Sequence, residues 1–245
     1  MRNLYRKNEL AFALVWIAAY VAGTCLAETL NEVLGVFKVF SALIHISLSI
    51  FALIWLKKNG LREKYGLFLP CYRLSRAWFF LPLAAVGLYK LCFSPAPRYS
   101  AADTVFFVVS MLCVGFLEEL VFRGFLFRSL ERENLAGAIV ISSLTFGIGH
   151  IVNLLNGQSL SDTAWQVLFA VVVGFALVIL FHKGGSLIPC IVFHGIFNAL
   201  SAVSNDEAMY QALGGKKTAV LILSGACIIL LGSWSLWNWK HLKHG

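Results

Sequence analysis

Long apolar segments separated by short polar ones make up most of this chain. Apolar runs of about 18 to 22 residues recur from end to end, which is the length that a helix needs to cross a hydrocarbon layer about 30 Å thick. Inside a bilayer the backbone must satisfy its own hydrogen bonds, so such runs predict helices. We predict eight membrane-spanning helices, at residues 9–27, 37–56, 77–94, 103–122, 135–155, 163–182, 187–204 and 218–237.

The composition agrees with this pattern. The 245 residues are 59% hydrophobic and only 13% charged, and the mean hydropathy is +0.79. These values exclude an ordinary soluble domain. We therefore expect an all-α, polytopic integral membrane protein, with one transmembrane domain over residues 1–245 and the lipid bilayer as its surroundings.

Lysine and arginine alternate along the chain with the predicted spans. They precede span one and follow spans two, four, six and eight, whereas the other connections are poor in cations or balanced by acids. Cytoplasmic loops carry such an excess, so we expect both termini in the cytoplasm. The net charge of +8 is then mainly an orientation signal, with a secondary attraction to anionic headgroups, and we expect no nucleic-acid partner. The basic connection 57–77 is expected to lie along the membrane surface.

The six cysteines do not indicate a metal cluster or a disulfide framework. They are scattered, mostly within apolar spans, and no two form a C-x-x-C pair. We interpret them as small core residues. A cleaved signal peptide ending before Cys25 is an alternative for the first span; its removal would disturb the charge alternation, so we expect a spanning helix.

Two adjacent carboxylates, Glu118 and Glu119, stand inside the fourth apolar run. An ionisable group at this depth is costly and is by default a candidate for function. Arg123 follows Glu119 by one helical turn, so the two can form an ion pair on one face. Glu118 would then stay free to exchange a proton near neutral pH. The alternative is that the group is only a buried ion-pair clamp between helices.

Two later spans also carry polar groups. His150 stands near the end of the fifth run, and His194 and Asn198 stand one turn apart on the seventh. Each histidine alone would be interpreted as a hydrogen-bonded packing residue. Together with the carboxylates they place ionisable groups on three helices, which tolerate one another best around a common cavity.

These residues form three ordered motifs that resemble a known family. Glu118 to Arg123 resembles the E-E-x-x-x-R motif of the CPBP (Abi) intramembrane proteases, which include the CAAX prenyl endopeptidases and bacteriocin-processing proteins. Phe146 to His150 is similar to F-x-x-x-H, and His194 to Asn198 to H-x-x-x-N. The resemblance covers about residues 110–200, the expected catalytic core on spans four to seven.

The resemblance implies an eight-helix bundle whose polar cavity opens to the cytoplasm and hydrolyses a peptide bond near the membrane. The site residues that it implies are Glu118, Glu119, Arg123, His150, His194 and Asn198. By this resemblance Glu118 activates water with the help of His150. His194 and Asn198 stabilise the oxyanion, and the remaining two residues support the site.

Metal dependence is a separate question, since the family has long been labelled metalloprotease. Glu118, His150 and His194 are a plausible zinc set. However, no H-E-x-x-H is present, and a His-x-x-x-Asn pair suits an oxyanion better than a metal. We therefore expect a glutamate mechanism without a cofactor, with zinc as the alternative.

Other functions remain open from the residues alone. A proton-coupled transporter also uses buried acids and histidines, although no internal repeat relates the two halves. A non-catalytic immunity or scaffold protein would keep the spans but does not need the three motifs. The expected partner is a membrane-associated peptide or protein substrate, prenylated or not.

Overall fold

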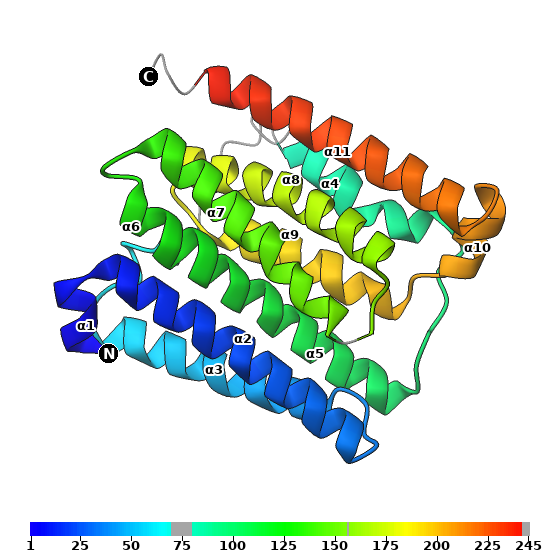
Figure 1. Cartoon of the computed structure of the whole chain (residues 1–245), viewed down its shortest axis with the longest axis horizontal. Helices are drawn as coiled ribbons and strands as arrows, with labels where there is room; N and C mark the ends of the chain where they lie inside the picture. The colour runs from blue at the N-terminus through cyan, green and yellow to red at the C-terminus, as the bar shows by residue number, and fades with distance from the viewer. Residues whose placement is uncertain (70–79, 156, 242–245) are drawn as a thin grey trace.

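The structure is a computed structural model that describes residues 1–69, 80–155 and 157–241, and in this part of the chain helices are the only regular secondary structure (Figure 1). Its helices are α1 (Arg2–Lys7), α2 (Glu9–Val33), α3 (Val39–Lys58), α4 (Leu81–Leu88), η2 (Tyr89–Cys92), α5 (Ala101–Glu118), η3 (Glu119–Phe127), α6 (Arg128–Leu130), α7 (Leu135–Gly149), η4 (His150–Leu154), α8 (Leu160–Gly184), α9 (Ile188–Ala199), η5 (Leu200–Ala202), α10 (Asp206–Ala212) and α11 (Lys216–Lys240).

The predicted all-α membrane protein is confirmed, and the count of about eight spans is approximate. Within the described ranges, six helices are long and apolar enough to cross a membrane. A seventh span results if Ile188–Ala202 and Asp206–Ala212, which meet at 88°, are counted together. The expected span 77–94 is represented by a shorter apolar helix, Leu81–Cys92. Its first residues, and part of the expected surface segment 57–77, fall on residues 70–79, which lie outside the described part.

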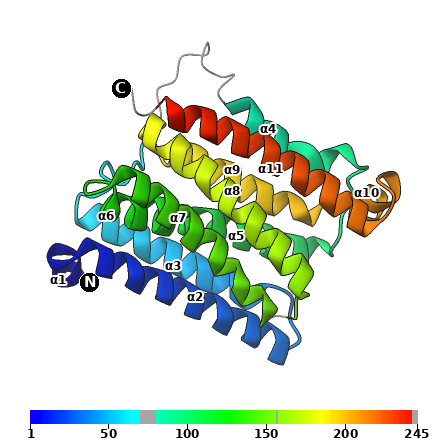
Figure 2. The same ribbon diagram turned by 45° about the horizontal axis from the view of Figure 1, so that its top comes forward.

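The long helices run side by side (Figures 1 and 2). In both views α2 and α3 form one edge of the bundle, α4 and α11 form the other, and α5, α7, α8 and α9 lie between them. The inner helix α5 packs against α3 on one side and α9 on the other, while α7 packs on α8. The helices that carry the predicted site residues are therefore the central ones.

Polar residues at the helix ends define where the spans begin. Asn8 caps α2 by accepting from the backbone N–H of Ala11 at 2.8 Å. Asn134 caps α7 in the same way through Gly137, at 2.9 Å. Such caps satisfy donors that the first helical turn leaves unpaired. At the other end of α8, Gly185 adopts a left-handed conformation with φ 69°, which stops the helix before α9.

The charged residues gather at the two ends of the bundle. At the end that holds α1 and the last turn of α11, Lys64 pairs with Glu9 at 2.6 Å, and Arg128 pairs with Glu131. At the opposite end Lys38 pairs with Glu28 at 2.7 Å. Most of the lysines and arginines lie at the first end, which we call the basic end.

Helices α5 and α9 touch through their backbones. A Cβ atom at Gly115 would lie 2.5 Å from the backbone nitrogen of Gly195 and 2.6 Å from its Cα atom. No side chain fits at that distance, so glycine at position 115 is required for this approach. The contact brings the end of α5, with its two carboxylates, directly against the helix that carries His194.

Candidate active site

The helix that holds the two carboxylates changes form between them. Glu118 is the last residue of α5, and Glu119 is the first residue of the π-helix η3, which continues to Phe127. All nine residues of η3 are buried. π-Helical turns are rare, and they occur frequently at functional sites. Sequence analysis predicted an uninterrupted α-helix here, since no residue pattern marks a π-helix.

Glu119, Arg123 and His194 form one buried group. Oε1 of Glu119 lies 3.1 Å from Nη1 of Arg123, and both side chains are fully buried. The same oxygen lies 2.7 Å from Nδ1 of His194. The predicted ion pair is therefore present. It joins a third residue from another helix, so it can hold the imidazole ring in place.

Arg123 is held by charge and by an aromatic face. Its Nη1 contact with Glu119 is a charge pair without an aligned hydrogen bond, and its three nitrogens have no hydrogen-bond partner among the described residues. The guanidinium carbon lies 4.1 Å from the centre of the Phe146 ring, so a cation–π contact adds to the ion pair.

Glu118 is directed to a different set of partners. Its Oε1 accepts a hydrogen bond from the Tyr20 hydroxyl at 2.7 Å. Its Oε2 lies 3.4 Å from Nε2 of His194, which is longer than a well-formed N–H···O bond. The second oxygen is therefore weakly engaged and available to a small molecule such as water.

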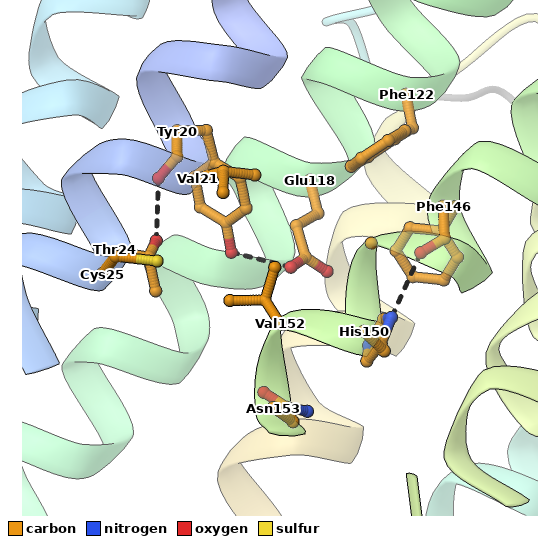
Figure 3. Close-up of a pocket in the computed structure, with 11 residues that line it drawn as sticks. Tyr20, Val21, Thr24, Cys25, Glu118, Phe122, Phe146, His150, Val152 and Asn153 are labelled. Carbon is orange, nitrogen blue, oxygen red and sulfur yellow. Dashed lines mark hydrogen bonds between the residues drawn. The ribbon is translucent and has the colours of Figure 1, made fainter. Parts of the chain in front are cut away.

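A cavity of about 100 Å³ lies against Glu118 (Figure 3). Its walls come from α2, from the junction of α5 and η3, and from the end of α7 with η4. It is lined by Tyr20, Val21, Thr24, Cys25, Glu118, Phe122, Phe146, Gly149, His150, Val152 and Asn153. Its lining is mostly apolar, but a cavity of this size that also presents Glu118, His150 and Thr24 can hold water molecules.

His150 faces this cavity from the wall opposite α2 (Figure 3). Its Nδ1 lies 3.1 Å from the backbone carbonyl of Phe146. A carbonyl oxygen can only accept, so Nδ1 carries the hydrogen, and in the neutral ring Nε2 is left as a base. The ring also meets Phe146 edge to face, as does the ring of His194.

Asn198 is the one predicted residue that no contact joins to this group. It lies half-buried on α9, one turn beyond His194. It is not among the residues that line the cavity, and its side chain has no hydrogen-bond partner within the described residues. Its place in the site stays a prediction.

Comparison with known proteins bears on the central part of the chain. Residues 100–200 match the family model described as Type II CAAX prenyl endopeptidase Rce1-like. This match supports the assignment to the CPBP/CAAX protease family that the three motifs indicate. A comparison with curated proteins gives no match. The family segment begins beside α5 and ends at η5, so it contains all six predicted site residues.

The polar groups around Glu118 do not form a metal site. No group of three or more His, Cys, Asp or Glu side chains in the described ranges is placed so that it could hold a metal ion. The alternative zinc set of Glu118, His150 and His194 is therefore not assembled as a ligand group.

One residue of the site lies outside the family segment and was missed by sequence analysis. Tyr20 on α2 makes the 2.7 Å hydrogen bond to Glu118, across 98 positions of sequence. Sequence analysis named no candidate site residue on the first two spans. A tyrosine within an apolar span resembles many packing residues, and only Thr24, one turn later, indicates a polar face there.

Proposed function

We propose that this chain is an intramembrane endopeptidase that hydrolyses a peptide bond of a membrane-associated protein or peptide. The family match supports a CAAX-type endopeptidase in general terms. The observation that carries the proposal is the shared cavity of Glu118 and His150, with His194 next to the same carboxylate. Water held there would meet a base on each side.

Glu118 is the proposed general base. Water bound at Oε2 loses a proton to the carboxylate, and the resulting hydroxide attacks the peptide carbonyl carbon. When the C–N bond of the tetrahedral intermediate breaks, the proton on Glu118 passes to the leaving amine nitrogen. His150, through Nε2, holds the same water from the other wall of the cavity.

His194 is the proposed donor to the oxyanion. Glu119, which is paired with Arg123, lies 2.7 Å from its Nδ1 and holds the ring so that a proton on Nε2 can be donated to the oxyanion. Asn198 is proposed as a second donor on the basis of its position one turn along α9. A preorganised donor of this kind is worth about 3 to 4 kcal/mol in a water-poor site.

We propose that the basic end faces the cytoplasm, because lysine and arginine are in excess there. Glu118 precedes Leu130, at that end, by twelve residues of helix, which is roughly 18 Å. The reacting groups therefore lie deep in the membrane.

The η4 wall of the cavity lies beyond Gly149, at the end of α7 that is farther from the basic end. Cytoplasmic access to the site stays a prediction.

Cleavage in proteoliposomes tests the proposed activity. The probes are an internally quenched, farnesylated peptide that ends in a CAAX sequence, and the same peptide without the lipid. We expect cleavage by the wild type and none by Glu118→Gln. Glu133→Gln, which neutralises an exposed carboxylate outside the site, should act as the wild type does.

A comparative profile of membrane peptides from cells that carry the wild type or Glu118→Gln identifies the substrate class. Prenylated protein ends and peptide precursors would each leave a distinct set of fragments. Ion flux in the same proteoliposomes without any cleavage would contradict the proposal and favour a transporter.

A further inference from the structure

The hydrogen bond between Tyr20 and Glu118 joins the N-terminal helices to the site. Tyr20 is only 7% exposed, and its hydroxyl donates a hydrogen bond of 2.7 Å to Oε1 of Glu118. We propose that Tyr20 is a positioning residue for the hydrolysis, and that α2 is therefore part of the active site. This inference rests on the proposed function and deepens it.

Tyr20 decides which oxygen of Glu118 is free to react. The Tyr20 hydroxyl has a single proton, which it donates in a hydrogen bond to Oε1 of Glu118. The other oxygen, Oε2, has only the 3.4 Å contact with His194 among the described residues. The water that faces the cavity can thus reach one oxygen in a fixed orientation. Without the phenol the carboxylate can rotate, and both oxygens compete for the water and for His194.

A separate set of hydrogen bonds holds α2 in the register that this contact needs. Thr24 donates to the backbone carbonyl of Tyr20 at 2.9 Å. Its hydroxyl is also 3.1 Å from Nε2 of His45 on α3, whose Nδ1 lies 3.0 Å from the Ser110 hydroxyl on α5.

The hydrogen bonds among Thr24, His45 and Ser110 can all form at once with a single assignment of protons. The single proton of Thr24 is used on a carbonyl, so Nε2–H of His45 donates to Thr24, and Ser110 donates to Nδ1. His45 is 1% exposed and Ser110 is fully buried, so water does not compete for these bonds. These hydrogen bonds tie α2 to α3 and to α5, the helix that ends at Glu118. The polar residues of the first two spans therefore act together to present Tyr20 to the carboxylate.

The test compares Tyr20→Phe with the wild type, as full-length protein in proteoliposomes with the quenched peptide probe. This change removes one oxygen atom and keeps the ring. We expect kcat to fall about tenfold to a hundredfold, which is the size of a lost hydrogen bond to a charged group. KM should stay unchanged, because the phenol touches the base and not the substrate.

The pH profile separates this role from a merely structural one. An ionised carboxylate that loses a donor is less stabilised, so the acid limb of kcat/KM should move to higher pH in Tyr20→Phe. The variant leaves unchanged the other titratable groups around Glu118, which are Glu119, Arg123, His150, His194 and His45. An unshifted profile with an unchanged kcat would overturn the inference.

Tyr99→Phe is the matched control. It also removes a phenol oxygen and keeps the ring contacts with Phe37 and Phe107, but its hydroxyl has no hydrogen-bond partner in the described ranges. We expect wild-type kcat and pH profile. An equal loss in both variants would show that the effect of Tyr20→Phe is general, and would contradict the positioning role.

A double-mutant cycle tests the contact without any substrate. Thermal unfolding of Tyr20→Phe, Glu118→Gln and the double variant should be non-additive, by about 2 °C or more, if the two side chains interact. If the wild type cleaves the peptide but the cycle is additive, only the positioning role of Tyr20 is overturned, and the proposed function stands. A wild type that cleaves no peptide would overturn the proposed function, and the catalytic role of Tyr20 with it, even if the cycle reports the contact.

Discussion

Nδ1 of His194 lies 2.7 Å from Oε1 of Glu119, although the two residues are 75 positions apart in the sequence. This bond joins α9 to the start of η3 and fixes the plane of the imidazole ring. Because Glu119 is also paired with Arg123, the ring rests on an anchored carboxylate. Nε2 of His194 is thereby directed to Glu118, the other carboxylate of the pair.

The first prediction concerns the buried ion pair. Arg123→Met leaves Glu119 as a buried charge without its partner, which should lower the free energy of unfolding by about 3 to 5 kcal/mol. The double variant Arg123→Met with Glu119→Gln should recover part of this loss, because no unpaired charge remains. Thermal unfolding in lipid nanodiscs measures both. A single variant as stable as the wild type would mean that the pair contributes little.

The second prediction concerns the contact between α5 and α9. In Gly115→Ala the new methyl group would meet the backbone of Gly195 at 2.5 Å, so the helices must separate. We expect lower thermal stability and loss of cleavage, because His194 moves away from both carboxylates. Gly225→Ala on α11 is the control, since a Cβ there meets nothing within 4 Å. Equal behaviour of the two variants would contradict the steric explanation.

The third prediction concerns His150. His150→Ala should reduce cleavage about a hundredfold or more, as expected for a group that takes part in proton transfer. Thermal stability should change little, because the ring is partly exposed and, within the described part of the chain, its one hydrogen bond is to the carbonyl of Phe146. His241→Ala removes a bond of the same local type, from Nδ1 to the carbonyl of Trp237, outside the site. It should leave activity intact.

The fourth prediction concerns metal removal. Since Glu118, His150 and His194 do not form a ligand group, we expect dialysis against EDTA to leave cleavage unchanged. The measurement is the cleavage rate before and after dialysis, with zinc content determined in parallel. Loss of activity that zinc restores would establish the alternative mechanism.

The fifth prediction concerns the side from which the cavity is reached. Cys25 lines the cavity, so it can report access in a variant that lacks the other cysteines. If the site faces the cytoplasm, a membrane-impermeant thiol reagent should modify Cys25 only when applied to the cytoplasmic side of sealed vesicles. Modification from the opposite side alone would contradict this orientation.

The sequence predicted those features of the site that depend on one helix. The ion pair of Glu119 and Arg123 follows from residues one turn apart, and it is present. Contacts between helices could not be derived in this way. Nothing in the spacing indicates that His194 meets Glu119, because that bond depends on the approach of α5 and α9 at two glycines.

Two further features of the site, the π-helix and Tyr20, could not be predicted from the local sequence pattern. The π-helix after Glu118 alters the directions of the side chains that follow, and no residue type specifies it. Tyr20 was missed because its polar partner is far away in the sequence, so its apolar neighbours made it look like a packing residue. Asn198 illustrates the reverse case. Its spacing of four residues from His194 predicts a shared helical face, yet in the described residues no contact joins its side chain to the cavity.

The backbone contact between Gly115 and Gly195 also sets a limit on how the molecule can move. Two helices that already touch at main-chain atoms cannot be compressed, and closely packed interiors transmit displacement instead of absorbing it. Glu118 and His194 therefore travel as one rigid unit. In the proposed hydrolysis, any widening that admits a polypeptide would have to come from the η4 wall, because hydrogen bonds tie the α2 wall to α3 and α5.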